Sequence, residues 1–192
     1  MNFLAHFYLS GDDDSLRVGN FLGDYLRNKQ VEQLPERLQE GVQLHRDIDS
    51  YTDQHPEVLK GVRRLYKRHS KYAPVIVDIF YDYLLSVNWP NYSEKSLEAF
   101  RQEVYTSLQE HLHLMPAPVK DYVPRMVADD WLATYGSHNG LTHTFQRLRQ
   151  RTSKPKLING AVDSLVIDFP QLNEEFNRFF PDIIAFVRSR VA

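Results

Sequence analysis

The sequence predicts an all-α protein, a single-domain helical bundle of about eight to ten helices. Apolar residues recur mostly at the three- and four-residue spacing of a helix face, and alternating runs of β-branched residues, typical of half-buried strands, are nearly absent. Prolines and glycines interrupt this pattern at helix-length intervals. With 192 residues, 42% of them hydrophobic, the chain is long enough for one sizeable core, so we expect one domain over residues 1–192.

The pattern assigns the helices in order. Ser15 is a candidate N-cap for a helix that runs to about Asn28. Pro35 opens a long helix, "PERLQEGVQLHRDIDSYTDQ", with acid in its first turn as the helix dipole favours. Pro56 and Pro74 lie near the starts of the next two helices, and the second is apolar almost all round, which is typical of a buried helix. Further helices are expected at about 93–113, 119–135, 140–152, 159–168 and 171–190.

Composition and charge exclude several kinds of function. The chain has no cysteine, which excludes disulfides, thiolate metal sites and cysteine catalysis. Its net charge of −2 gives no reason to expect a nucleic-acid partner. The stretch "MNFLAHFYLSGDDD" lacks the basic region of a signal peptide, and no apolar run approaches eighteen residues, so we expect a soluble cytoplasmic protein without a membrane partner.

Polar residues recur at a four-residue spacing that places them on one face of a helix. His45, Asp49 and Asp53 form such a stripe in the long helix after Pro35. The same spacing occurs in three further segments: Asn2 with His6, Asn20 with Asp24, and Asp78 with Asp82. Four separate segments therefore each present oxygen or nitrogen ligands from one face.

The pair Asp78 and Asp82 is the most informative, because the helix that carries it is expected to be buried. Burying a charged carboxylate without a partner costs several kcal/mol, and two carboxylates four residues apart repel each other. Either their protons stay on or a cation lies opposite. A divalent metal would neutralise several carboxylates at once, and the His/Asp set without thiolate favours Mn²⁺ or Mg²⁺, with Fe²⁺ or Zn²⁺ as alternatives.

A structural network is the alternative interpretation of the same residues. Arg46 or a tyrosine hydroxyl could satisfy Asp82, and Arg46 could equally pair with Asp49. His6 alone would be a core histidine, and Asp53 would help to end one helix or cap the next. The recurrence of the pattern in four segments favours a metal or polar catalytic centre over these separate explanations.

Several of these motifs together resemble a known family. The segments "MNFLAHFYLS", "GNFLGDY", "HRDIDSYTD" and "APVIVDIFYDYLLS", with Trp89, are similar to those of the acyl carrier protein phosphodiesterases over roughly the first 90 residues. The resemblance implies hydrolysis of the phosphodiester that joins 4′-phosphopantetheine to a serine of acyl carrier protein. It also implies an HD-domain-like helical fold, as in metal-dependent phosphohydrolases, and dependence on Mn²⁺, with Mg²⁺ or another divalent cation as alternatives.

Carried over by position, the resemblance implies a metal centre with five candidate ligands: Asp24, His45, Asp49, Asp78 and Asp82. It implies that His6 and Asp53 lie close to this centre. His45, Asp49 and Asp78 are expected to bind the cation, whereas Asp24 and Asp82 are ligands or orient the attacking water. His6 would contact a phosphate oxygen or protonate the departing serine oxygen, and Arg46 would hold phosphate or a carboxylate. Asn2 and Asn20 are expected to orient their same-face partners. The adjacent His-Asp dipeptide that names the HD group is absent, which leaves the ligand set and metal number open.

A basic segment, residues 61–71, lies between two of the site-bearing helices and contains no acid. Its charged residues are candidates for binding the acidic carrier protein: Arg63, Arg64, Lys67, Arg68 and Lys71. An ordinary solvated helix face is the alternative. A second basic stretch at 147–156 is a competing surface. Other functions also remain open, namely a phosphohydrolase of similar fold acting on a nucleotide or another small phosphoester, and a non-catalytic module that binds acyl carrier protein.

Overall fold

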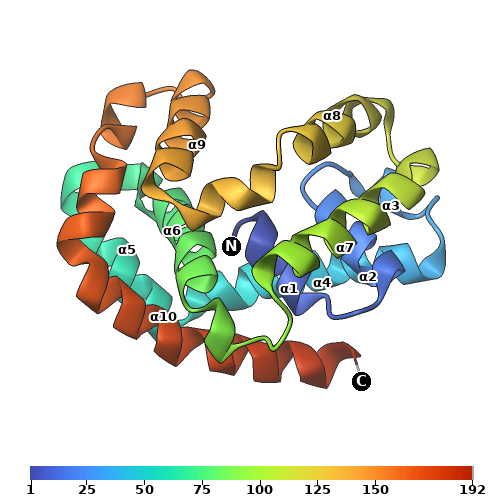
Figure 1. Ribbon diagram of the computed structural model, residues 1–192, viewed down its shortest axis with the longest axis horizontal. Coiled ribbons are helices and arrows are strands. Elements are labelled where there is room, and N and C mark those ends of the chain that lie inside the picture. Colours follow the sequence, from blue (N-terminus) through green and yellow to red (C-terminus); the bar gives the residue numbers. More distant parts are fainter. Residues whose placement is uncertain (192) are drawn as a thin grey trace.

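The computed structural model describes residues 1–191, which form ten α-helices joined by short loops and 3-10 turns, without a strand in that range (Figure 1). The all-α prediction is confirmed. The α-helices are α1 (Phe3–Leu9), α2 (Asp14–Leu22), α3 (Asn28–Val31), α4 (Glu36–Gln54), α5 (Pro56–His69), α6 (Ala73–Val87), α7 (Leu97–Glu110), α8 (Ala117–Ala128), α9 (His138–Gln150) and α10 (Ala161–Val191). The 3-10 helices are η1 (Ser70–Tyr72), η2 (Trp89–Asn91), η3 (Leu112–Leu114), η4 (Trp131–Gly136) and η5 (Pro155–Ile158).

Helices α2 and α4 pack with their backbones in close contact, because each has a glycine at the crossing. A Cβ atom on Gly19 would lie 2.2 Å from the Leu38 carbonyl oxygen, and one on Gly41 would lie 2.4 Å from the Leu16 carbonyl oxygen. Only residues without a side chain allow this approach. The crossing brings the polar residues of α2 next to those of the middle of α4.

Helix α1 is attached to the buried helix α6 by a side-chain cap. The carboxylate of Asp82 accepts hydrogen bonds from the backbone N–H groups of Leu4 at 2.8 Å and Ala5 at 3.1 Å. These are free donors of the first turn of α1, so a buried carboxylate meets both the hydrogen-bonding need and the positive end of the helix dipole. The contact fixes the position of α1, and with it His6.

The N-terminal helices differ from the prediction in their limits. Helix α2 ends at Leu22 rather than near Asn28, and its N-cap is Asp13, whose carboxylate accepts from the Leu16 N–H, rather than Ser15. Either residue type can cap a helix, so composition did not separate the two. The short helix α3 follows as a separate element.

The C-terminal region contains one long helix where the sequence predicts two. Helix α10 spans 31 residues and includes Pro170, which was expected to separate helices at 159–168 and 171–190, as well as Pro181. Figure 1 shows it as a curved helix along one side of the molecule, and it contacts α4, α5 and α6. Proline removes one hydrogen bond and bends a helix, but an apolar stripe that continues past both prolines keeps the helix packed on the core. The buried residues of that stripe include Leu172, Phe176, Phe180 and Ile183.

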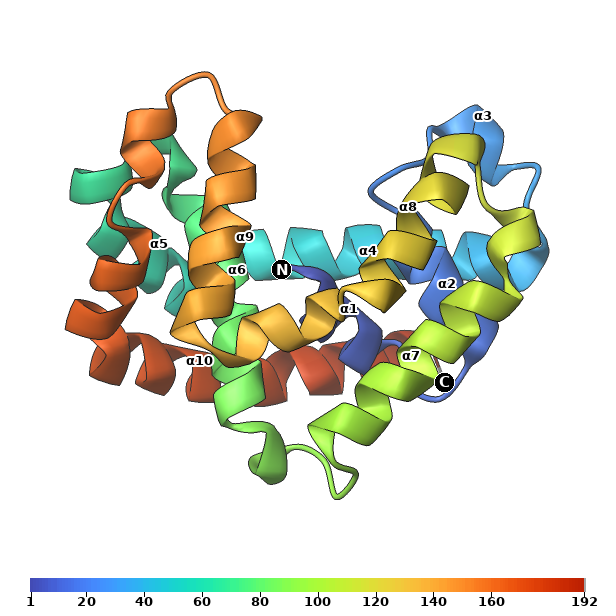
Figure 2. The same ribbon diagram turned by 45° about the horizontal axis from the view of Figure 1, so that its top comes forward.

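The predicted helix at 119–135 is divided. Helix α8 ends at Ala128, Asp130 has a left-handed backbone conformation with φ of 42°, and η4 then leads into α9. In Figure 2, α8 and α9 lie on either side of the marked N-terminus, with the segment that joins them passing beside it. Among residues 1–191, no helix is both long and apolar enough to cross a membrane.

Candidate metal centre and active site

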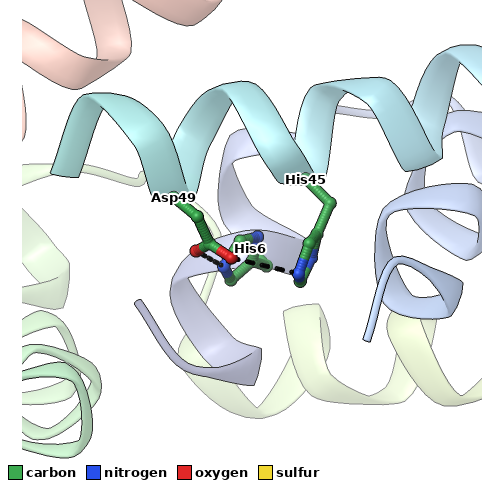
Figure 3. Close-up of side chains that lie close together, drawn as sticks. All are labelled: His6, His45 and Asp49. Carbon is green, nitrogen blue, oxygen red and sulfur yellow. Dashed lines mark hydrogen bonds and ion pairs between the residues drawn. The ribbon is translucent and has the colours of Figure 1, made fainter. Parts of the chain in front are cut away.

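Two histidines and one aspartate form a compact cluster where α1 meets α4 (Figure 3). His6 comes from α1, and His45 and Asp49 lie one turn apart on α4. The Asp49 carboxylate lies 3.1 Å from His6 Nε2 through Oδ1 and 3.2 Å from His45 Nε2 through Oδ2. One ligand atom from each of the three residues can be chosen so that all lie within 4.8 Å of one another. Both histidines are buried, and Asp49 is partly exposed.

Asn20 of α2 determines how the two imidazoles are oriented. Its Oδ1 atom lies 2.9 Å from His6 Nδ1 and 3.2 Å from His45 Nδ1. Its Nδ2 atom donates to the His6 carbonyl oxygen and to Ser10 Oγ, which shows that the oxygen of the amide faces the rings. Because an amide oxygen only accepts, both Nδ1 atoms must carry a hydrogen. In the neutral rings, both Nε2 atoms then present lone pairs toward Asp49.

This arrangement fits a divalent cation. Two imidazole lone pairs that face a carboxylate repel it unless a proton or a metal ion lies between them. A hydrogen bond to the far ring nitrogen is the usual way in which proteins orient a metal-binding histidine. Two nitrogen donors and an oxygen donor suit Mn²⁺, Fe²⁺ or Zn²⁺ better than Ca²⁺. The residues present are therefore chemically suited to hold the metal that the sequence predicts.

The protonation of each group in the cluster depends on the charges of its neighbours. Burial alone would lower the pKa of His45, but the carboxylates of Asp24 and Asp49 raise it to about 9. Burial would raise the pKa of Asp49, yet its hydrogen bonds with His45 and His6 hold that pKa well below its ordinary value. For His6, burial dominates and lowers the pKa. A positive charge at the cluster is thus favourable, whether a proton or a metal ion carries it.

A cavity of about 610 Å³ opens beside the cluster. Its lining includes four carboxylates: Asp24, Asp49, Asp53 and Asp78. The α-amino group of Met1 lies 3.3 Å from Asp49 Oδ1 and 3.4 Å from Asp78 Oδ1, so a positive group already lies between these two carboxylates. Burial raises the pKa of Asp78. The cavity is therefore acidic on the side next to the cluster, and the rest of it has space for a ligand.

Comparisons with known proteins show which family the chain belongs to. The model of the family "Acyl carrier protein phosphodiesterase" matches residues 1–183. The chain belongs to the acyl carrier protein phosphodiesterase family. Curated relatives of that name include proteins from Photorhabdus laumondii, 26% identical over 94% of this chain and 92% of the relative, and from Yersinia enterocolitica, 29% identical over 96% of each. A relative of the same name from Salmonella dublin is 28% identical over 96% of each chain.

Membership of this family confirms the resemblance found in the sequence and the prediction that the chain is an enzyme. No solved structure matches the chain. The relationship to HD-domain phosphohydrolases therefore stays a prediction.

Asp24 lies next to the histidine cluster, but its position in the chain is not the one that the sequence predicts. It lies beyond the end of α2, in a turn, and not on a helical face shared with Asn20. Its Oδ1 is nevertheless 3.3 Å from His45 Nε2. A Cβ atom on the preceding Gly23 would lie 2.4 Å from the His45 ring, so this turn can pass the histidine only with glycine at that position. The fold therefore brings together five of the predicted residues: Asp24, His45, Asp49, Asp53 and Asp78.

Of the predicted site residues, Asp82 and Arg46 belong neither to the histidine cluster nor to the cavity lining. Asp82 is fully buried, and its carboxylate is occupied by the first turn of α1. Arg46 is exposed and donates to the Asn28 side chain. Within residues 1–191, neither side chain has a hydrogen bond or an ion pair with His6, His45 or Asp49. The geometry favours a positioning role for Asp82, since it holds the helix that carries His6.

The structure shows contacts of His6 and Asn20 that the sequence did not predict. Sequence reasoning treats His6 as a phosphate or leaving-group contact, whereas its Nε2 atom joins the group of possible metal ligands. It pairs Asn20 with Asp24, whereas the amide bridges two histidines from other helices. The spacing of Asn2 and His6 at the start of the chain was the available signal, but spacing within one helix does not reveal partners on another.

The five basic residues of α5 and η1 differ in their surroundings. Arg64 and Arg68 form ion pairs with Glu175 and Asp168 of α10, and Lys71 contacts Ser153 Oγ. Within residues 1–191, Arg63 and Lys67 have no ion pair, and both are exposed. Docking of a partner on this face stays a prediction, and these two exposed residues are the ones best placed for it.

Proposed function

We propose that this protein is a metal-dependent phosphodiesterase that removes 4′-phosphopantetheine from the serine of holo-acyl carrier protein. Family membership supports the substrate, since the curated relatives carry the name of that activity. The observation that carries the metal dependence is the Asn20 amide, which turns both imidazoles so that their Nε2 atoms face Asp49. We infer that the cation is Mn²⁺, with Mg²⁺ or another divalent ion as alternatives.

His6, His45 and Asp49 would hold the cation, with Asp24 and Asp78 next to them. A divalent ion bound there would supply Lewis-acid activation of water and would offset the negative charge of the phosphodiester. The protein contributes the surroundings for this chemistry. Asn20 maintains the tautomers of the two histidines, and the cap from Asp82 holds α1 against α6.

The cavity supports the remaining steps of hydrolysis. Asp24 and Asp78 line it on the acidic side. In the proposed reaction they would orient a water molecule toward a bound phosphate. In the reaction, the water oxygen adds to phosphorus, the bond from phosphorus to the serine oxygen breaks, and that oxygen takes a proton. The products are 4′-phosphopantetheine and the apo-carrier protein. Holding the phosphate beside an oriented water converts an unfavourable encounter into a reaction within one complex.

The direct test is to incubate the protein with holo-acyl carrier protein and Mn²⁺, with and without a chelator, and to follow the loss of the prosthetic group by mass spectrometry. We expect turnover that stops on chelation. Substitutions His45→Gln and Asp49→Asn should lower turnover by at least about a hundredfold, since they remove donors of the cluster. Asp47→Asn is the matched control, because Asp47 lies on the same helix but accepts from Gln43 instead.

The alternatives give different outcomes. Release of phosphate from nucleotides, without action on the carrier protein, would identify a small-molecule phosphohydrolase. Binding of the carrier protein without turnover under any metal would identify a non-catalytic module. Equal turnover by the wild type, His45→Gln and Asp49→Asn proteins would remove the proposed centre.

A further inference from the structure

The cavity beside the histidine cluster has a second side with a different chemistry. The acidic side comes from the segments around α1, α4 and α6. The opposite side comes from α8, η4 and α9, and it contributes aromatic residues and two arginines: Tyr122, Trp131, Tyr135, Arg147 and Arg151. Figure 2 shows that α8 and α9 lie on either side of the N-terminus. The α-amino group there lies between Asp49 and Asp78 of the acidic side. Sequence reasoning names the stretch 147–156 only as a competing surface for a protein partner.

The two arginines lie on one face of the C-terminal end of α9. Arg147 and Arg151 are four residues apart, and Thr144 and Leu148 on the same face also line the cavity. Arg149 is not among the lining residues. The helix therefore directs two of its arginines toward the cavity and one elsewhere.

Arg147 is held in place by an aromatic ring rather than by an acid. Its guanidinium carbon lies 4.4 Å from the centre of the Trp131 ring, and Trp131 packs edge-on against Tyr122 with 4.8 Å between centroids. Stacking of this kind restricts the guanidinium while leaving its N–H groups free to donate. In the described part of the chain, neither Arg147 nor Arg151 has a carboxylate within ion-pair distance. Arg147 is half-buried and Arg151 is exposed. A half-buried guanidinium without a counter-ion, such as that of Arg147, gains most from an anion that enters the cavity.

The charges of the arginines and of the carboxylates both affect groups inside the cavity. Burial raises the pKa of Tyr122, whereas Arg151 and Arg147 act against this rise and Asp24 adds to it. The Tyr122 hydroxyl is therefore within electrostatic reach of both sides of the cavity. An anionic phosphodiester that approaches four carboxylates is repelled by them, and two guanidiniums opposite would offset part of that repulsion. The planar N–H fork of arginine also matches the oxygens of a phosphate group.

We propose that Arg147 and Arg151 form an anion subsite that binds the phosphate of 4′-phosphopantetheine, with Trp131 and Tyr122 as the wall along which the attached arm lies. This inference rests on the proposed function for its ligand. It assigns substrate binding to the helix after η4, whereas the histidine cluster serves the reaction. It also gives the arginines at the C-terminal end of α9, in the basic stretch 147–156, a role inside the cavity rather than on a docking surface.

The binding can be measured without turnover. Free 4′-phosphopantetheine is titrated into the protein in the presence of a chelator, with tryptophan fluorescence as the signal. The chain has two tryptophans, and Trp89 is buried outside this cavity, so Trp131 should report the ligand. Pantetheine without phosphate and inorganic phosphate alone separate the contributions of the arm and of the anion.

We expect Arg147→Gln to weaken binding of 4′-phosphopantetheine by about tenfold or more, Arg151→Gln to weaken it less, and Arg149→Gln to leave it unchanged. Pantetheine should bind weakly and equally to all four proteins. Trp131→Phe should abolish the fluorescence response. With holo-acyl carrier protein and Mn²⁺, Arg147→Gln should raise KM more than it lowers kcat. Circular dichroism melting of each variant checks that folding is retained.

Two results would overturn the inference. Equal affinity of the Arg147→Gln and Arg149→Gln proteins for 4′-phosphopantetheine would exclude the subsite, even if the enzyme remained active on the carrier protein. Weakened binding of the carrier protein alone, with the small ligand unaffected, would assign the arginines to protein docking instead. Conversely, arginine-dependent binding of 4′-phosphopantetheine by a protein that does not hydrolyse the holo-carrier would retain the subsite and reject the proposed function.

Discussion

The imidazole rings of His6 and His45 stack with 4.3 Å between their centroids and 22° between their planes, although they come from different helices. Both rings turn the same nitrogen, Nδ1, toward one acceptor, the Asn20 side-chain oxygen. Stacked rings that share an acceptor must also direct their other nitrogens to a common side. The metal centre proposed here depends on this arrangement of three side chains from α1, α2 and α4.

The amide of Asn20 is the first point to test. Asn20→Leu keeps the approximate size of the side chain but removes the acceptor for both Nδ1–H groups. We expect the affinity for Mn²⁺, measured by calorimetry, to fall about 10- to 100-fold, because the imidazoles lose the bond that orients them. We also expect a loss of stability of about 1–3 kcal/mol, since buried donors become unpaired. Asn28→Ser, at an exposed site, is the control, and unchanged Mn²⁺ affinity in a folded Asn20→Leu protein would contradict the assignment.

Metal binding should stabilise the fold. At a Mn²⁺ concentration about a hundred times its dissociation constant, linkage gives about 2.7 kcal/mol, which corresponds to a rise in Tm of roughly 5–10 °C for a chain of this size. Calorimetric melting of the wild type and Asp47→Asn should show the rise, whereas His45→Gln and Asp49→Asn should not. A chelator should reverse it. The same shift in all four proteins would place the metal at another site.

Asp82 should make stability depend on pH. Burial raises its pKa from 3.8 to about 7, against the opposing effect of the two N–H groups that it accepts. Between these two pH values the Asp82 carboxyl binds more protons in the folded state than in the unfolded state. The free energy of unfolding that Asp82 contributes therefore decreases as pH rises through this range, by at most about 1.4 kcal/mol per pH unit. This decrease in the free energy of unfolding is complete at pH values above the pKa of Asp82 in the folded state.

The comparison of the wild type with Asp82→Asn isolates that contribution. Urea unfolding at pH 4, 5.5, 7 and 8 should show the stability of the wild type declining relative to the variant as pH increases. Asparagine can accept from only one of the two N–H groups, of Leu4 or Ala5, so the variant should also lose some stability at low pH. Stability curves that run parallel across this range would show that Asp82 has an ordinary pKa.

The basic face of α5 should separate into structural and docking residues. Arg64→Ala removes the partner of Glu175, whose side chain is only 6% exposed, so we expect a loss of about 2 kcal/mol in chemical denaturation. The double variant Arg63→Glu, Lys67→Glu should keep its stability, since neither residue has an ion pair in the described chain. If α5 docks the acidic carrier protein, the double variant should bind it more slowly at low salt and similarly at high salt. Identical association rates at low salt would place the docking surface elsewhere.

Local pattern was sufficient to predict the all-α class and most of the central helices. Pro35 and Pro56 lie at the starts of α4 and α5, because proline lacks the N–H that a helix leaves free in its first turn. The pairing of His45 with Asp49 also follows from spacing, since both lie on one helix. Where local signals compete, the prediction was wrong, as for Pro170, which was expected to end a helix but lies within α10.

The composition of the site depended on contacts between helices. Periodicity describes neighbours within three or four residues, and it contains no information on which helix faces which. The close crossing at Gly19 and Gly41 brings Asn20 beside His45, and the buried carboxylate of Asp82 holds α1 so that His6 completes the cluster. The amino-acid pattern therefore determined which residues could bind a cation, whereas backbone packing decided which of them meet, because only the folded chain brings donors from separate helices within a few ångströms.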